Sequence, residues 1–410
     1  MLVGPNSTGK TSFLALIRAL WDVAFREVVP NFREEPYDLG SFEDIVSNGS
    51  RTLTNETRFF RGEFRSGIYL GSLEDTIGFA ANFENWQTAP YPNVRTFCSD
   101  GVMVELRATE SRDGGVQVRL RTGEITWPDP GNEMAATHSS GFVPLAFLNP
   151  MLRRMFGTDN QHVDRFFDIM DAIAESAPRL IAAAPTRSRP RRTYDPAVLR
   201  GDPEGVYIPS YLANLSRQAG DEWQSLKTGL EQFGSQSELF DEIRIRSFGR
   251  SDGDPFQIQV RKHSGPKSRR RKGPWHNVID VGYGVSQALP MLTELLRPEP
   301  PTMFLLQQPE VHLHPQAQAA LGTLFCKVAA GGRQLLVETH SDNIIDRVRM
   351  DVRDQTTGLK PEDVSILYFE PGDLDVKIHS IRLDEMGNVV DAPQGYRQFF
   401  TDEMMRSIGL

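Results

Sequence analysis

The stretch Gly4-Pro5-Asn6-Ser7-Thr8-Gly9-Lys10-Thr11 follows the pattern Gly-x-x-x-x-Gly-Lys-Thr and lies near the start of a 410-residue chain. Glycines in such a loop let backbone N–H groups approach an anion closely, and the N-terminus of a following helix favours negative charge. The lysine of the pattern reaches the β- and γ-phosphates, and the hydroxyl after it suits Mg²⁺. The loop therefore predicts a site for a nucleoside triphosphate and Mg²⁺, made by these residues together with Ser12.

The segments on either side of the loop bear on this prediction. Apolar side chains between Phe13 and Phe25 recur mostly three or four positions apart, as they do in an amphipathic helix. Before the loop, only Met1 to Val3 can form a strand. Because this strand is short, we expect either that the sheet lacks its first strands or that they are encoded upstream.

The composition is that of an ordinary globular protein. Hydrophobic residues make up 39% of the chain and charged residues 24%, and the net charge of −9 gives no overall attraction to nucleic acid or to an anionic membrane. The two cysteines predict a reducing compartment without a disulfide framework. No apolar run approaches the roughly 20 residues of a membrane helix, and no secretory signal is visible. We therefore expect a cytoplasmic protein without a membrane partner.

The periodicity of the sequence changes along the chain and predicts three domains. Residues 1–135 hold the loop, its helix and, from about residue 51, segments that alternate with period two as antiparallel strands do. These segments are 52–54, 58–64, 102–106 and 116–120, with a hairpin signal at 113–115. Residues 136–275 have helical periodicity over 146–184 and 209–233 and contain two basic loops. Residues 276–410 alternate buried strands with helices, one of them at 315–329, which predicts an α/β sheet. Residues 256–260 and 275–281 are expected to pair as a hairpin.

A buried strand at residues 302–306 ends in Gln307-Gln308-Pro309-Glu310. In a phosphate-loop enzyme, an acid at this strand end helps to hold Mg²⁺, and a second one orients the attacking water. An amide can hold a water molecule, but it cannot act as a general base and lacks the charge that retains Mg²⁺. We assign Gln307 to the metal site with Thr11, and Gln307, Gln308 and Glu310 to catalysis, with Glu310 as the compensating acid. The alternative is an ordinary strand that ends at a proline.

Two other polar turns occur at the ends of predicted elements. His340 follows the strand 334–338, where it can contact a γ-phosphate or serve as a structural histidine. A glycine-containing turn precedes the helix 288–296, and its N–H groups form either a second anion site or a simple tight turn. The residues assigned to this second site are Gly282, Gly284, Ser286 and Gln287. His312 and His314 share a face of an extended segment, but two histidines alone do not make a zinc site.

Taken in order, these motifs resemble those of ABC-type ATPases in the OLD-like or SMC-like branch of the bacterial ATPases labelled AAA. Residues 4–11 resemble the Walker A loop, 280–290 the ABC signature, 306–315 the Walker B strand with its D-loop, and 338–341 the switch histidine. The resemblance implies a P-loop NTPase with an ABC-ATPase-like sheet, an antiparallel β subdomain and a mainly helical insertion. It also implies ATP and Mg²⁺ as cofactors.

The resemblance further implies a mechanism. Two protomers close head to tail around two ATP molecules, each held by Gly9, Lys10 and Thr11 of one copy and by the 284–286 region of the other. His340 senses the γ-phosphate, and the middle region transmits closure to an effector protein. We therefore expect a nucleotide-dependent dimerising switch in DNA maintenance or anti-phage defence. The basic loops 187–192 and 262–272 either track a DNA backbone or are solvated surface loops.

The sequence departs from the family pattern at the end of the Walker B strand. The family usually carries an acid where Gln307 stands, commonly followed by Glu or Gln, so two amides put hydrolysis in question. An amide here is also the usual engineered means of trapping ATP. The alternative function is a nucleotide-binding scaffold that recruits a partner without turnover. A nuclease is disfavoured, because only 40 residues follow Glu370, too few for the C-terminal nuclease domain that OLD relatives often carry.

Overall fold

The computed structural model groups the chain into two compact units, Met1–Thr11 with Arg179–Leu410, and Ser12–Pro178. Each unit is described by itself. The structure describes residues 1–26, 28–45, 59–70, 73–86, 89–99, 102–108, 116–122, 134–138, 153, 164, 167–168, 171, 179–196, 204–249, 251, 253–264, 271–297, 302–373, 375–393, 395–396 and 405.

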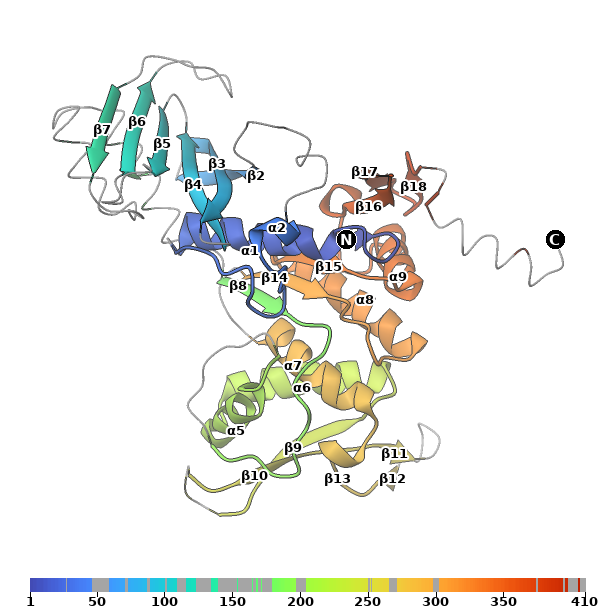
Figure 1. Ribbon diagram of the computed structural model, residues 1–410. Helices are drawn as coiled ribbons and strands as arrows, with labels where there is room; N and C mark the ends of the chain where they lie inside the picture. Colours follow the sequence, from blue (N-terminus) through green and yellow to red (C-terminus); the bar gives the residue numbers. More distant parts are fainter. Residues whose placement is uncertain are drawn as a thin grey trace. The chain divides into compact units, whose positions relative to one another are not determined.

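The first unit is built on a mixed sheet with the strand order β18-β17-β16-β1-β15-β14-β8 (Figure 1). The strands from β16 to β8 run parallel, and β17 and β18 are added antiparallel at one edge. The strand bounds are β1 (Leu2–Val3), β8 (Arg179–Ala183), β14 (Thr302–Gln307), β15 (Gln334–Glu338), β16 (Ile366–Pro371), β17 (Val376–Leu383) and β18 (Val389–Val390).

The short strand β1 lies inside this sheet. Leu2 pairs with Glu338 of β15 on one side and with Leu367 of β16 on the other, and its side chain is 1% exposed. Two residues are enough here because both neighbouring strands hydrogen-bond to them and the apolar side chains are buried. The expected short strand is therefore present. It places the phosphate loop at the carboxyl end of a central strand of the sheet.

Helices of the first unit bury their apolar faces against the sheet and against one another. Side chains that are fully buried on three of the helices, Leu230, Leu292 and Leu321, join the core with Phe304 of β14. The helices are α5 (Ile208–Gln218), α6 (Asp221–Gln236), α7 (Tyr283–Leu296), α8 (Pro315–Ala330) and α9 (Asp342–Asp354), with 3₁₀ turns η4 (Val278–Asp280) and η5 (Pro361–Asp363).

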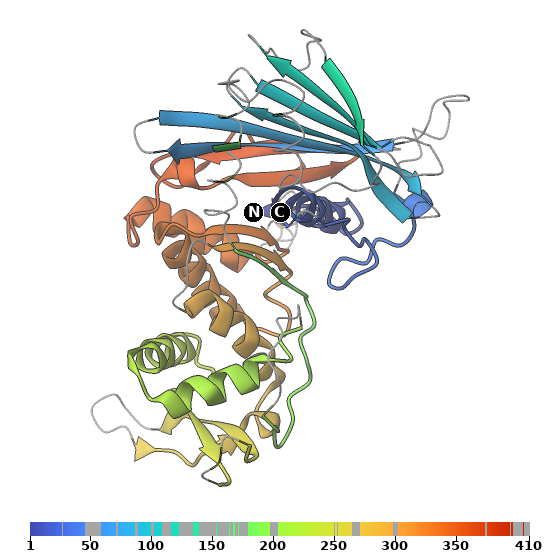
Figure 2. The same ribbon diagram turned by 90° about the vertical axis from the view of Figure 1, so that its left-hand side faces the viewer.

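A smaller sheet belongs to the same unit. Its strands β9 (Glu242–Ser247), β10 (Phe256–Arg261) and β13 (His276–Asn277) pair antiparallel, and β11 (His263–Ser264) and β12 (Arg271–Lys272) form a hairpin beside them. Helices α5, α6 and α7 lie between this smaller sheet and the central sheet (Figures 1 and 2).

The second unit contains an antiparallel meander in which each strand pairs with the next along the chain (Figure 2). Helix α1 (Lys10–Phe25) begins at the last residues of the first unit and continues here, and α2 (Phe42–Ile45) follows. Phe83 of the meander is fully buried and contacts the ring of Phe32 edge-on at 5.5 Å. The strands are β2 (Phe59–Leu70), β3 (Leu73–Trp86), β4 (Ala89–Ser99), β5 (Val102–Ala108), β6 (Val116–Thr122) and β7 (Met134–His138).

The predicted fold class is confirmed, since a parallel-stranded α/β sheet follows the phosphate loop and a separate antiparallel sheet is present. The prediction of helix through residue 184 was wrong at its end, because β8 occupies Arg179–Ala183 and pairs with β14. Most of residues 146–178 lie outside the described residues. The predicted strand 275–281 is shorter, because η4 replaces it from Val278. The three domain boundaries stay a prediction.

Strands β3, β4 and β9 were not predicted, whereas α8 and β14 match their predicted ranges closely. Helix α7 begins at Tyr283, five residues before its predicted start, so most of the predicted glycine-containing turn is the first turn of the helix. The predicted strand at 52–54, the hairpin signal at 113–115 and the tip 265–270 of the second basic loop lie outside the described residues. Within the part of the chain that the structure describes, no helix has the length and apolar character needed to cross a membrane.

Candidate nucleotide-binding site

Three neighbouring strand ends bring the candidate site together. Strand β15 lies between β1 and β14, and its last residue, Glu338, is paired with Leu2 on one side and with Gln307 on the other. Paired residues on parallel strands direct their side chains to the same face of the sheet. Ligands of open α/β sheets bind at the carboxyl ends of the strands. The phosphate loop, Gln307 and Glu338 therefore lie together at the carboxyl ends of these three strands.

The phosphate loop turns sharply at its two glycines. Gly4 has φ +141° and Gly9 has φ +79°, both in the region that favours glycine. A Cβ atom at Gly4 would lie 2.5 Å from the carbonyl oxygen of Phe369. Inside the turn, Thr8 Oγ1 donates to the carbonyl of Pro5 at 2.9 Å. The glycines thus permit a tight loop. Its residues Asn6 and Ser7 are exposed, as is Ser12 in the first turn of the following helix.

Lys10 is the first residue of α1, and its side chain is held inside the loop. It is 3% exposed, and Nζ donates to the carbonyl of Pro5 at 2.6 Å and to that of Gly4 at 3.1 Å. Burial lowers the pKa of Lys10, and the negative charge of Glu338 opposes that shift. An ammonium group with three rotatable donors can exchange such carbonyls for phosphate oxygens.

Thr11 connects the loop to both neighbouring strand ends. Its Oγ1 donates to Glu338 Oε2 at 2.9 Å and accepts from Gln307 Nε2 at 3.0 Å. Gln307 Oε1 is buried and has no hydrogen-bond partner among the described residues. Glu338 is 4% exposed, and burial raises the pKa of its carboxyl while the Thr11 hydrogen bond and Lys10 oppose the shift. The predicted metal residues Thr11 and Gln307 are thus in contact, and Glu338 joins them.

Sequence reasoning missed Glu338 as a site residue. Its signal was an acidic residue at the end of a predicted buried strand, the same signal that was sought at 307. The acid was overlooked because its sheet neighbours are set by strand order, which brings Glu338 next to Gln307 across 31 positions of sequence.

The oxygen atoms at these strand ends fit Mg²⁺ bound to a nucleotide. Mg²⁺ takes hard oxygen ligands, keeps several waters and is usually held by one or two protein groups together with substrate phosphates. The Thr11 hydroxyl, the Glu338 carboxylate and Gln307 Oε1 are oxygen ligands of that kind. Among the described residues no cluster of three or more His, Cys, Asp or Glu side chains forms a protein-only cage. The site therefore suits a cation that arrives with its phosphates.

The other candidate catalytic residues surround the same strand ends. Glu310 is 8% exposed, and its Oε1 accepts from the backbone N–H of His340 at 2.7 Å, whereas its Oε2 has no hydrogen-bond partner in the described part of the chain. Burial raises the pKa of Glu310, and the His340 hydrogen bond opposes this. Partial burial, and then the charge of Lys10, lower the pKa of His340. Gln308 has φ +41°, and its N–H donates to the Glu338 carbonyl. Hydrogen bonds therefore join the segment after β14 to the end of β15 and the turn that carries His340.

The residues of the second predicted anion site have mixed environments. Gly282 precedes α7, which begins without a side-chain cap, and Tyr283 is 52% exposed. Ser286 Oγ donates to the Tyr283 carbonyl at 3.0 Å. Gln287 is 1% exposed; its Oε1 accepts from the N–H of Arg187, and its Nε2 donates to the carbonyl of the same residue. A Cβ at Gly284 would lie 3.0 Å from the carbonyl oxygen of His312. The exposed helix start is available to an anion, while the side chains of Ser286 and Gln287 bond within the chain.

One member of the histidine pair, His314, has a structural role. His314 Nδ1 accepts from the N–H of Ala317 and thereby caps α8. The ring of His312 lies 5.4 Å from that of Tyr283.

The basic loops hold less free charge than their composition suggests. Arg187 is 2% exposed, so it cannot contact a DNA backbone, and this part of the sequence expectation was wrong. Burial lowers the pKa of Arg187 to about 10. Arg192 is paired with Asp280. At the second loop, Glu242 forms ion pairs with Arg261 and Lys272 and a hydrogen bond with His263.

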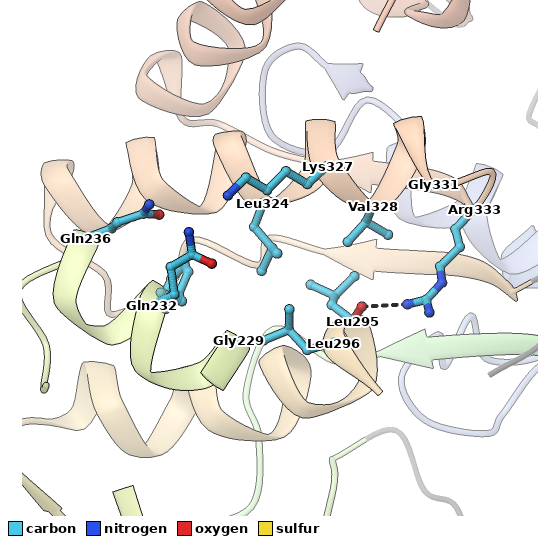
Figure 3. Close-up of a pocket in the computed structure, with 11 residues that line it drawn as sticks. Gly229, Gln232, Gln236, Leu295, Leu296, Leu324, Lys327, Val328, Gly331 and Arg333 are labelled. Atoms are coloured by element: carbon cyan, nitrogen blue, oxygen red, sulfur yellow. Dashed lines mark hydrogen bonds between the residues drawn. The ribbon is translucent and has the colours of Figure 1, made fainter. Parts of the chain in front are cut away.

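Two cavities lie away from the phosphate loop. One of about 270 Å³ lies among α6, α8 and the end of α7, where Arg333 donates to the Leu295 carbonyl at 2.6 Å (Figure 3). It contains no predicted site residue. The other, of about 760 Å³, is lined by residues 282–285 at the start of α7, here called the signature turn, by His312 and His314 and by residues 260–264. The signature turn therefore borders an open space.

Residues 149–346, just under half of the chain, match the family model described as "AAA domain, putative AbiEii toxin, Type IV TA system". The matched residues are therefore similar to an AAA domain. The matched segment includes the signature turn, β14, β15 and His340, and the phosphate loop precedes it. No curated protein matches the sequence at a significant level. The loop, the strand order and this match together define a P-loop NTPase fold.

Among solved structures, SMC head domains resemble the chain only distantly. The SmcHead bound to the C-winged helix domain of ScpA is 10% identical, with a TM-score of 0.38, over 94% of this chain and 90% of that one. The SMC head domain from Thermotoga maritima is 12% identical, with a TM-score of 0.30, over 92% and 88%. A structure described under ATP-driven dimerization and DNA stimulated activation of SMC ATPases is 11% identical, with a TM-score of 0.29, over 47% and 96%. Likeness at this level adds no functional argument.

Proposed function

We propose that the chain binds ATP with Mg²⁺ and acts as an ABC-type ATPase whose nucleotide closes a homodimer. The observation that carries this proposal is the convergence of the phosphate loop and two strand ends on the hydroxyl of Thr11. Lys10 is buried within the same loop, and burial, followed by the nearby charge of Lys10, lowers the pKa of His340. A triphosphate placed on the loop would meet an ammonium group, a cation site and a histidine at its terminal end.

The signature turn supports closure against a second copy. Gly282 is exposed and begins α7 without a side-chain cap, so the first N–H groups of the helix are open to an anion. In the resemblance that the motifs carry, this turn contacts the γ-phosphate held by the partner protomer. ATP bound to one copy would then contribute contacts that exist only in the closed dimer, and these shift the population toward that state.

A role in DNA maintenance or in defence against mobile DNA forms the biological part of the proposal. The description of the matching family as a putative AbiEii toxin of a type IV toxin–antitoxin system supports defence. We assign the coupling to an effector protein to the middle region of the chain. DNA contacts are confined to basic side chains that stay exposed, such as Arg189, Arg191 and Arg271.

The dimer is tested by measuring mass at micromolar protein, with and without ATP and Mg²⁺, by sedimentation velocity. We expect the mass to double with MgATP for the wild type and to remain that of a monomer for Lys10→Met. Lys360→Met is the matched control, because Lys360 is an exposed lysine outside the site. A wild-type protein that binds a fluorescent ATP analogue but stays monomeric would contradict the dimer and leave nucleotide binding intact.

The amides at 307 and 308 favour a second candidate function, a nucleotide-binding scaffold that recruits its partner without turnover. Neither amide can accept a proton from the attacking water as a carboxylate does. Phosphate release by the wild type, lost in Lys10→Met, would rule this candidate out. A sharp rise in rate for Gln307→Glu, from a wild-type rate near background, would support it.

A further inference from the structure

The carboxylate that is absent from the end of β14 has a counterpart on the neighbouring strand. We propose that Glu338, at the end of β15, supplies the carboxylate of the Mg²⁺ site in place of an acid at 307. Glu338 would hold the cation together with the hydroxyl of Thr11, and Gln307 would contribute its amide oxygen. This inference rests on the proposed binding of MgATP, and its test is designed to separate the two.

The register of the sheet makes the replacement geometrically direct. Glu338 and Gln307 are partners in the parallel ladder between β15 and β14, so their side chains extend from adjacent strands toward the same side. Both reach one atom: Thr11 Oγ1 lies 2.9 Å from Glu338 Oε2 and 3.0 Å from Gln307 Nε2. A carboxylate on either strand end therefore meets the same hydroxyl.

Glu338 lies among other buried charged groups. Glu338 and Glu310 are both buried and interact unfavourably; the charge of Lys10 offsets that of Glu338, and the charge of Arg187 offsets that of Glu310. The ammonium of Lys10 donates to carbonyls of its own loop and to Thr8, so its hydrogen bonds serve the loop. Buried carboxylates are costly unless they are paired or coordinate a metal. A divalent cation bound to Glu338 would offset the repulsion between the two carboxylates.

Unsatisfied oxygens at the same place give an independent indication. Gln307 Oε1 and Glu310 Oε2 are both buried without a hydrogen-bond partner in the described residues. Buried oxygens of this kind are uncommon in folded proteins, and a bound ion or an ordered water often satisfies them. The Nε2 group of Gln307 already donates to Thr11, which leaves Oε1 as the atom that can coordinate a hard cation.

A purely structural role for Glu338 would also explain its hydrogen bond to Thr11. In that case the residue would anchor the start of α1 and contribute nothing that depends on a metal. The two roles differ in the effect of Mg²⁺ on nucleotide affinity, which can be measured without turnover.

The experiment measures the affinity of the full chain for a non-hydrolysable ATP analogue by calorimetry, in Mg²⁺ and in EDTA. We expect Mg²⁺ to tighten binding by the wild type and Glu338→Gln to lose about tenfold or more of that gain. Its affinity in EDTA should stay close to that of the wild type. The double variant Gln307→Glu with Glu338→Gln, which moves the acid back to β14, should recover the gain. Glu362→Gln, on the exposed turn η5, is the matched control.

A second readout follows the metal itself. The electron paramagnetic resonance spectrum of Mn²⁺ with the analogue should show a protein-bound ion for the wild type and for the double variant, and a weakened signal for Glu338→Gln. If Glu338→Gln keeps the full Mg²⁺ gain and an unchanged Mn²⁺ spectrum, Glu338 is structural and the inference is wrong. If the wild type binds no nucleotide in either condition, the proposed function fails instead. Circular dichroism and thermal unfolding establish that each variant is folded.

Discussion

Gln287 was assigned to nucleotide binding on its sequence motif, but its environment predicts a mainly structural effect. The side chain is 1% exposed and lies in the first turns of α7. Its amide forms two hydrogen bonds with one residue of a distant loop, at 2.8 Å from the N–H of Arg187 and at 3.2 Å to its carbonyl. Gln287→Leu keeps a similar volume and removes both bonds at once.

The expected magnitude follows from the groups left behind. Each buried backbone group of Arg187 that loses its partner costs about 1–3 kcal/mol, because it was desolvated on folding. Leucine recovers part of this by burying apolar surface in place of an amide. We therefore expect Gln287→Leu to lower the free energy of unfolding by about 2–4 kcal/mol. Affinity of the folded protein for ATP should change less than fivefold, since no hydrogen bond of this side chain depends on nucleotide.

Urea unfolding followed by circular dichroism measures the global effect, and hydrogen exchange of peptides that contain Arg187 measures the local one. Exchange at this segment should accelerate in Gln287→Leu, because its N–H loses its acceptor. Gln224→Leu is the matched control, as Gln224 is exposed on α6 and should change stability by less than about 0.5 kcal/mol. Unchanged stability together with a tenfold loss of ATP affinity would refute the reasoning and restore Gln287 to the nucleotide site.

Two further predictions concern the loop and the smaller sheet. Gly4→Ala should destabilise the protein by about 1–3 kcal/mol in thermal unfolding, because φ +141° and the Phe369 carbonyl at 2.5 Å leave no room for a Cβ; Gly220→Ala, with nothing within 4 Å, should be tolerated. Although burial alone would raise the pKa of Glu242, hydrogen bonds led by that from Arg261 lower it from 4.5 to about 2. A lowered pKa stabilises the fold above the unfolded value, so Glu242→Gln should cost about 1 kcal/mol at neutral pH. That difference should disappear as the pH falls from 4.5 to about 2 in acid unfolding, and a pH-independent difference would contradict it.

Local patterns were sufficient for much of the fold. The pattern of glycines and Lys10 predicted a tight loop that opens a helix, because backbone freedom and helix-terminal polarity are properties of a few adjacent residues. Apolar periodicity likewise predicted α8 and β14 nearly to the residue. Prediction failed at β8, whose Leu-Ile-Ala-Ala run suits either structure and becomes a strand because β14 offers an edge to pair with.

The sequence by itself determined that a phosphate loop, a strand ending in amides and a histidine turn occur in this order. Only the tertiary structure decided which acid meets the loop, since Thr11 and Glu338 are 327 positions apart and are joined by the order of β1, β15 and β14. It likewise buried Arg187 against Gln287, 100 positions away. Hydrogen bonds across such separations depend on strand order and register, which no local periodicity records. The carboxylate sought at residue 307 was therefore found on the adjacent strand.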